Sequence, residues 1–237
     1  MDEDEIFLLR GMHMFVRKEI KEVFTPRNHH VNDIMYISRP EIKKLLERKL
    51  DGTKHIIIYG ESGCGKSWLY KKVLNDKNIT YGTINLANAS RFGSITNVFY
   101  DEFAKKVPFE KVEYIDSKKA NAGIGVLEGG LESQNKYGKS IRDPIREYIK
   151  LLKKQKSIII LENLESIFNN IKLMDELGDI LTLLDDEDYS IKFLIVGVPS
   201  GVMQYYSNRE LLKTVSNRLT ELPEIKGLNK VQVKEFI

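Results

Sequence analysis

One short segment constrains the fold of this chain more than any other: an apolar strand, a glycine-rich loop and a helix in immediate succession. Residues 54–59 end in four apolar or aromatic residues, and residues 66–75 carry apolar side chains at helical spacing. The loop between them reads GESGCGKS, which matches the pattern G-x-x-x-x-G-K-[ST]. A strand that leads through such a loop into a helix is typical of parallel sheets covered by helices.

The residue types of this loop suit a bound polyphosphate. Its glycines allow backbone angles that side chains forbid, so consecutive N–H groups can turn towards phosphate oxygens beside the positive end of the helix. We expect Lys66 to reach the β- and γ-phosphates and Ser67 to ligate Mg²⁺. The expected cofactors are ATP or ADP with Mg²⁺, and GTP is the alternative. The predicted nucleotide-binding residues are Gly60, Glu61, Ser62, Gly63, Cys64, Gly65, Lys66, Ser67, Trp68 and Arg39.

A second apolar strand ends in polar residues of the kind that a magnesium site needs. Residues 157–161 are followed by Glu162 and Asn163, which resembles the Walker B pattern of four apolar residues, Asp and Glu. We predict that Glu162 belongs to the metal shell, together with Ser67. Asn163 can orient a water molecule but cannot take its proton, and Glu165 can substitute only in part. We therefore predict slow hydrolysis, with Lys66, Glu162 and Asn163 as catalytic candidates.

The rest of the chain alternates strands with helices. We expect further helices over 5–24, 40–51, 94–107, 141–155, 172–185 and 201–216, and further strands over 79–86, 191–198 and 219–222. This alternation predicts an α/β fold in which a parallel β-sheet is sandwiched by helices. Residues 110–137 combine alternating apolar residues with four glycines. That pattern favours a β-hairpin-like insertion, and a second phosphate loop is the alternative.

Composition restricts the class of protein. The 237 residues are 42% hydrophobic, and 37 Lys+Arg against 34 Asp+Glu give a net charge of +3, which leaves nucleic-acid binding open. No apolar run approaches the roughly 18 residues that cross a bilayer. The acidic start Asp2-Glu3-Asp4-Glu5 is unlike a signal peptide, so we expect a cytoplasmic protein without membrane contact. A single cysteine excludes an internal disulfide framework.

Three further stretches complete a family resemblance that runs from about Phe24 to the end of the chain. They are SRPE at 38–41, similar to a Gly-Arg-Glu box, IVGVPS at 195–200, and NRLTELPEIKGLNKVQVKEFI at 217–237. With the loop and the strand at 158–163, they resemble the ATPase module of AAA+/STAND-type P-loop proteins, in the branch of origin-recognition-like initiators and bacterial regulatory ATPases. The resemblance implies a sensor-1 role for Ser200 and makes Arg218 a catalytic candidate that reaches a neighbouring subunit. A simple turn and a surface arginine are the respective alternatives.

The resemblance also implies a domain division and a role. Residues 1–39 would form an N-terminal helix and connector, 40–226 the P-loop ATPase core, and 227–237 the start of a lid or winged-helix region in a longer protein. The implied function is a nucleotide-dependent switch that assembles as a homo-oligomer or in a larger complex, for example in antiviral defence. The alternatives are a DNA-acting AAA+ ATPase, such as an initiator or transposition regulator, and a module whose nucleotide is structural.

Overall fold

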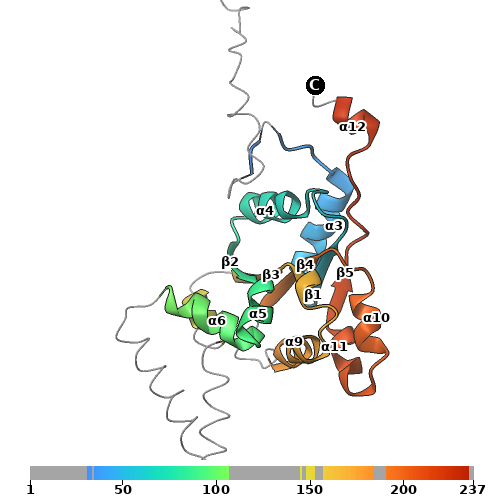
Figure 1. The fold of residues 1–237 in the computed structure, drawn as a ribbon. Coiled ribbons are helices and arrows are strands. Elements are labelled where there is room, and N and C mark those ends of the chain that lie inside the picture. The colour runs from blue at the N-terminus through green and yellow to red at the C-terminus, as the bar shows by residue number, and fades with distance from the viewer. Residues whose placement is uncertain are drawn as a thin grey trace, which may run out of the picture.

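A five-stranded sheet of parallel strands lies at the centre of the structure (Figure 1). The structure is a computed structural model that describes residues 31–33, 35–106, 145, 148–152, 157–183 and 191–234. The strands are β1 His55–Tyr59, β2 Thr80–Asn85, β3 Ser157–Glu162, β4 Lys192–Gly197 and β5 Leu219–Glu221, in the spatial order β2-β3-β4-β1-β5. The predicted α/β fold with a parallel sheet is confirmed.

Helices cover both faces of this sheet (Figure 1). One face carries α3 (Pro40–Asp51) and α4 (Lys66–Asp76). The opposite face carries α5 Ala87–Phe92, α6 Ile95–Ala104, α9 Ile171–Leu183, α10 Val202–Ser207 and α11 Lys213–Asn217. A short helix, α12 (Lys230–Lys234), follows near the C-terminal end. Among the described residues, no helix has the length and apolar character needed to cross a bilayer.

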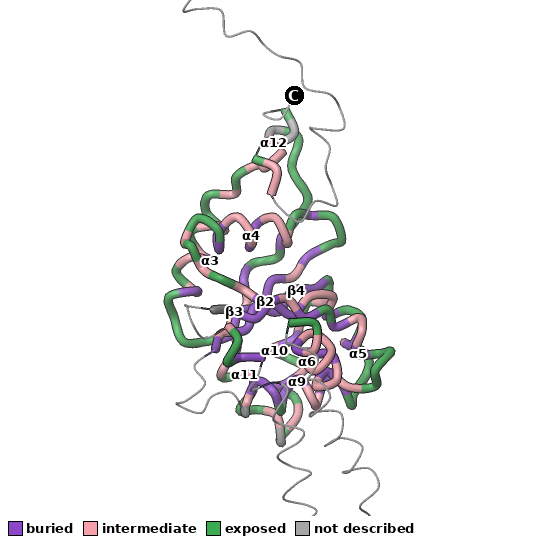
Figure 2. The backbone as a smooth tube through the Cα atoms, turned by 90° about the vertical axis from the view of Figure 1, so that its left-hand side faces the viewer, coloured by how far each residue is buried: buried purple, intermediate pink, exposed green. Residues whose placement is uncertain are grey.

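The strands carry apolar side chains on both faces because each face is buried under helices. Ile57 belongs to the apolar cluster that contains residues of α5, α6 and α9, whereas its neighbours Ile56 and Ile58 belong to the cluster that contains residues of α3 and α4. Successive side chains of a strand point to opposite faces, so a continuous apolar run places apolar side chains in the cores on both sides of the sheet. Figure 2 shows the result as buried backbone through the centre of the molecule with exposed segments around it.

Several predicted boundaries differ from those in the structure. An additional helix, α5, precedes α6, and Gly93 separates them with a left-handed backbone (φ +69°). The expected helix over 201–216 is divided into α10, a 3-10 turn at Glu210–Leu212 and α11. Of the expected helix over 141–155, residues 145 and 148–152 are described and helical. The predicted helix 5–24 and the predicted hairpin-like insertion near 110–137 lie outside the described residues.

The start of α6 is held by a carboxylate from another helix. Glu176, on α9, accepts hydrogen bonds from the backbone N–H groups of Ile95 at 2.8 Å and Thr96 at 2.9 Å. It also accepts from the hydroxyls of Ser94 at 2.6 Å and Thr96 at 2.8 Å. The first N–H groups of a helix have no partner within the helix, so this carboxylate satisfies them and complements the helix dipole.

We predict that Glu176→Ala lowers the free energy of unfolding by about 2–3 kcal/mol, because it leaves half-buried donors at the start of α6 without their acceptor. Glu176→Gln keeps one acceptor oxygen and serves as the matched variant, with a smaller loss expected. Urea unfolding followed by circular dichroism measures both. Equal stability of the alanine variant and the wild type would contradict the assigned role.

Candidate functional site

The order of the strands brings the two predicted halves of the site to one edge of the sheet. β4 lies between β1 and β3 and is parallel to both. The carboxyl ends of these three strands therefore point the same way, and this is the edge at which open parallel sheets bind ligands. The glycine-rich loop follows β1 directly, and Glu162 is the last residue of β3.

The backbone of the loop requires its glycines. Gly60, Gly63 and Gly65 have φ values of +150°, +78° and +90°, which L side chains rarely adopt. A Cβ atom at Gly60 would also overlap the backbone carbonyl of Ile225, whereas a Cβ at Gly63 would meet nothing within 4 Å. The loop is thus tight at its first glycine and open at its second.

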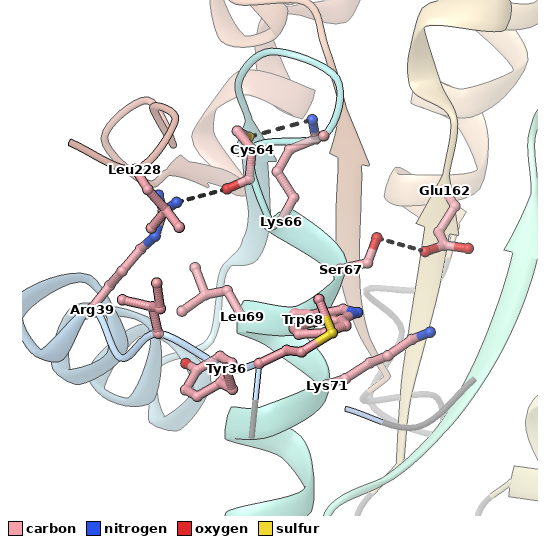
Figure 3. A pocket seen from close by; sticks show the side chains of 14 residues that line it. Tyr36, Arg39, Cys64, Lys66, Ser67, Trp68, Leu69, Lys71, Glu162 and Leu228 are labelled. Carbon is pink, nitrogen blue, oxygen red and sulfur yellow. Dashed lines mark hydrogen bonds between the residues drawn. The ribbon is translucent and has the colours of Figure 1, made fainter. Parts of the chain in front are cut away.

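The start of α4 has the properties of an anion site. Gly65 is its N-cap residue and provides no side-chain cap, and no acidic residue lies in the first turn. N–H groups at a helix start attract negative charge. Lys66 lies beside them, where its Nζ donates to the backbone carbonyls of Gly60 and Glu61, both at 2.7 Å. It also donates to Cys64 Sγ at 3.8 Å (Figure 3). The cationic group therefore lies within the curve of the loop.

Glu162 reaches across from β3 to two hydroxyl groups of α4. Ser67 Oγ lies 3.4 Å from Glu162 Oε1 (Figure 3), and the Tyr70 hydroxyl donates to the same oxygen at 2.6 Å. Burial, and then the negative charge of Glu162, raise the pKa of Tyr70 well above its ordinary value, so this hydroxyl stays protonated and remains a donor. The structure thus brings Ser67 and Glu162 together and adds Tyr70, which the sequence analysis did not name.

A pocket of about 670 Å³ opens beside the loop. Arg39, Lys66, Ser67 and Glu162 are among its polar lining residues. Its apolar and aromatic lining comes from Met35, Tyr36, Ile37, Trp68, Leu69 and Leu228. One wall is therefore suited to a flat apolar group and the other to charged oxygens, a combination that fits a nucleotide.

The donor set fits magnesium only if a ligand supplies further oxygens. Within the described ranges, no group of three or more His, Cys, Asp or Glu side chains could hold a metal ion. Ser67 and Glu162 offer a hydroxyl and a carboxylate, which are ligands that Mg²⁺ accepts, and Mg²⁺ commonly completes its shell with water and substrate phosphates. This arrangement therefore suits a magnesium–nucleotide complex and not an isolated metal site.

The polar residues after β3 are tied to neighbouring strands. Asn163 has a left-handed backbone (φ +61°), and its Nδ2 donates to Asn85 Oδ1 at the end of β2, at 2.7 Å. Glu165 Oε2 accepts from the backbone N–H of Val198, just after β4, at 3.1 Å. An amide therefore occupies the position next to Glu162, and the carboxylate of Glu165 is held at the end of β4.

Two of the predicted residues lie away from the pocket. The backbone carbonyl of Arg218 accepts from the N–H of His55, the first residue of β1, at 2.8 Å. Arg218 therefore lies at the amino edge of the sheet, opposite the loop, and its guanidinium donates to the carbonyl of Thr214 at 3.0 Å. Ser200 is exposed, three residues beyond β4, and does not line the pocket. Neither residue joins the site of its own chain in this structure.

The segment after β5 forms a further part of the site that the sequence did not reveal. The N–H of Leu222 donates to the carbonyl of Ile57, and that of Ile225 donates to the carbonyl of Tyr59, both at 2.9 Å. The chain therefore continues alongside β1 as far as the glycine-rich loop. Leu219 and Leu222 suggested only a short final strand, because Pro223 interrupts the apolar pattern.

Arg39, the N-cap residue of α3, joins this segment to the loop. Its guanidinium donates through Nη2 to the carbonyl of Cys64 at 2.7 Å (Figure 3). It also donates through Nη1 to the carbonyl of Lys226 at 2.6 Å. Bonds from a charged donor are stronger than neutral ones. Arg39 thus lines the pocket, where it holds the protein's own backbone.

A comparison with known families agrees with this geometry. Residues 48–204 match the family model described as the AAA domain. The chain belongs to the AAA domain family. The expected P-loop AAA+ ATPase resemblance is thereby confirmed at the level of the family, and the parallel sheet and the loop after β1 are those of a P-loop ATPase.

Solved structures with a similar fold include proteins of Aeropyrum pernix and Pyrococcus abyssi. The chain matches the Aeropyrum pernix ORC2 protein in ADPNP–ADP complexes, with a TM-score of 0.56 and 14% identity, over 92% of this chain and 55% of that one. It matches a Walker-type ATPase of Pyrococcus abyssi with a TM-score of 0.56 and 14% identity, over 90% of this chain and 60% of that one. At such identity, these matches establish the fold alone.

In two more matches, this chain covers half or less of the matched protein. The Aeropyrum pernix ORC1 protein in complex with DNA matches with a TM-score of 0.50 and 14% identity, over 89% of this chain and 50% of that one. Among curated proteins, ABC transporter F family member 4 of Dictyostelium discoideum is 26% identical over 184 residues, which are 78% of this chain and 16% of that protein. The chain therefore spans well under two thirds of each of these relatives.

We predict different costs for alanine at two glycines of the loop. Gly63→Ala should lower the free energy of unfolding by about 1–2 kcal/mol, because only its left-handed backbone opposes the new side chain. Gly60→Ala should cost more than that, because the new Cβ also meets the Ile225 carbonyl. Urea unfolding of both variants measures the difference. A Gly60→Ala variant as stable as Gly63→Ala would contradict the close approach of the 222–225 segment.

Proposed function

We propose that this AAA domain binds ATP or ADP with Mg²⁺ and acts as a STAND-like regulatory switch, with slow hydrolysis and with assembly into an oligomer. The observation that carries the proposal is the double hydrogen bond of Arg39 to the loop and to the segment after β5. Because one guanidinium binds both, a change in the conformation of the phosphate-binding loop can change the position of the segment after β5. Antiviral defence is the setting that the resemblance to STAND-type modules favours.

Each proposed binding residue has a defined task. The N–H groups of residues 60–65 and the Lys66 ammonium would hold the phosphates, and Trp68 would line the wall of the pocket. Ser67 and Glu162 would hold Mg²⁺, which when bound neutralises charge that develops on the phosphate oxygens. Lys66 donates to the neutral carbonyls of Gly60 and Glu61, and a phosphate would replace these partners easily. A hydrogen bond from the ammonium to a charged phosphate oxygen is stronger than one to a neutral carbonyl.

The switching step follows from the contacts of the loop. Cys64, whose carbonyl Arg39 holds, is surrounded by the residues that would turn their N–H groups to phosphate. A nucleotide that shifts this carbonyl weakens or strengthens the bond to Arg39, and Lys226 shares the same guanidinium. ATP and ADP can shift the equilibrium only through different affinities for the two arrangements. We propose that the γ-phosphate supplies this difference.

Slow hydrolysis is supported by the groups that follow β3. A general base must accept a proton from the attacking water, and the Asn163 amide cannot do so. Glu165 can, but it accepts a hydrogen bond from Val198 that fixes it at the end of β4. We propose that Lys66, Glu162 and Asn163 position the nucleotide and the water, and that an arginine from a neighbouring copy, with Arg218 as the candidate, contributes to the rate.

The proposed division of the chain places residues 40–226 in the ATPase core, 1–39 in an N-terminal helix and connector, and 227–237 at the start of a lid or winged-helix region. Leu228 lines the pocket, and α12 follows two residues later. This position is suitable for a lid that responds to the nucleotide. The first lid residues would then contribute directly to the binding site.

A second candidate function is that of a DNA-acting AAA+ ATPase. One structure of similar fold, the Aeropyrum pernix ORC1 protein, is a complex with DNA. Binding of duplex DNA that weakens steeply with salt would favour this function, because phosphate contacts release counterions. Assembly that depends on ATP and not on DNA would favour the switch.

We predict that light scattering finds a larger mass for the wild type with Mg-ATP than with ADP or without nucleotide. Lys66→Ala should keep the smaller mass in all three conditions, because it removes the phosphate-binding cation while leaving the fold intact. Lys172→Ala, a change of an exposed lysine on α9 that does not line the pocket, is the matched control and should assemble normally. Identical masses for the wild type in all conditions would contradict switching by assembly.

We also predict that turnover of Mg-ATP is slow, and that Asn163→Asp raises it at least about ten-fold by introducing a proton acceptor. Aspartate suits this position because, like asparagine, it adopts the left-handed backbone found there. Asn163→Ala is the control and should not exceed the wild-type rate. Rapid turnover by the wild type that is unchanged in Asn163→Ala would contradict the assignment.

A further inference from the structure

The hydroxyl of Tyr70 makes the shortest hydrogen bond to Glu162 that is found in the described part of the chain. The Tyr70 side chain has no exposed surface, yet its one polar atom lies 2.6 Å from Glu162 Oε1. Ser67, three residues earlier on α4, reaches the same oxygen at 3.4 Å. Residues three apart lie on one side of a helix, so α4 presents two hydroxyls to this carboxylate.

We propose that Tyr70 is a positioning residue that fixes the Glu162 carboxylate for magnesium at the nucleotide site. This inference rests on the nucleotide-binding function proposed above. It adds a residue outside the glycine-rich loop and outside the apolar strand with its acidic end. Tyr70 acts through Glu162 and does not itself touch the nucleotide or the metal.

The need for such a residue follows from the length of the glutamate side chain. Glutamate has one rotatable bond more than the aspartate usual at this position, so its carboxylate has more conformers to lose when it is held in place. A buried donor that binds one carboxylate oxygen selects one of these conformers. Oε1 is then the held oxygen, and Oε2 of Glu162 remains available for the water shell of the metal.

Tyr70 is itself held firmly enough to fix a partner. Its ring packs edge-to-face against the Tyr81 ring of β2, with centroids 6.4 Å apart and planes at 88°. The side chain belongs to the apolar cluster between α3, α4 and the sheet. The ring therefore supports the hydroxyl from the sheet side.

The matched pair of variants is Tyr70→Phe and Tyr81→Phe. Both keep the aromatic ring and the packing, but only the first removes the donor to Glu162. We measure binding of a fluorescent ATP analogue, mant-ATP, against Mg²⁺ concentration and again in EDTA. In Tyr70→Phe, the Mg²⁺ concentration for half-maximal enhancement of binding should rise about ten-fold, since the lost bond is to a charged group. Binding in EDTA should not change, and Tyr81→Phe should follow the wild type.

A second comparison separates positioning from a structural role. In a Glu162→Ala background, Tyr70→Phe should produce no further change in Mg²⁺ dependence, because the residue through which Tyr70 acts is absent. A further shift of the same size in that background would overturn the proposal. An unchanged Mg²⁺ dependence in Tyr70→Phe alone would also overturn it, while leaving nucleotide binding by the wild type intact. Absence of mant-ATP binding by the wild type would instead overturn the proposed function, and the positioning role with it.

Discussion

The hydrogen-bonded pairing of β4 with both β1 and β3 is the constraint on which the rest of the structure depends. Leu161 of β3 is paired with Ile195 of β4, which is paired with Ile57 of β1. In this register Glu162 is level with Ile58 of β1, two residues before the loop begins at Gly60. A glutamate spans that offset to α4 better than a shorter acid would. The parallel sheet thus determines the reach that the acidic residue needs.

The same pairing explains a glycine whose role was not evident from the sequence. A Cβ on Gly197, the last residue of β4, would lie 2.7 Å from Leu164 Cβ and 3.1 Å from Glu165 Oε2. The turn after β3 therefore crosses close to the end of β4, and only a residue without a side chain allows it. This crossing places the Glu165 carboxylate at the N–H of Val198, where it accepts a hydrogen bond.

The sequence predicted the parts of the fold whose signals are local. Strands such as β1 and β4 are continuous apolar runs, and Ser94 and Pro40 mark helix starts where the structure has them. The contacts that join distant segments could not be predicted in this way. The residues next to Tyr70 in the sequence give no sign that its hydroxyl donates to Glu162. Glu176 accepts a hydrogen bond from the N–H of Thr96, which lies 80 residues earlier in the chain. Arg39 was assigned to the pocket from a resemblance, without its backbone partners.

The bond between Arg39 and Lys226 has a consequence for how this core can be connected to other segments. It joins two residues 187 positions apart, one at the start of α3 and the other just before α12. The polypeptide therefore enters and leaves the core at the rim of the same pocket. A segment attached at either side begins next to the glycine-rich loop, and the Arg39 guanidinium is a hydrogen-bonded link between both sides and that loop.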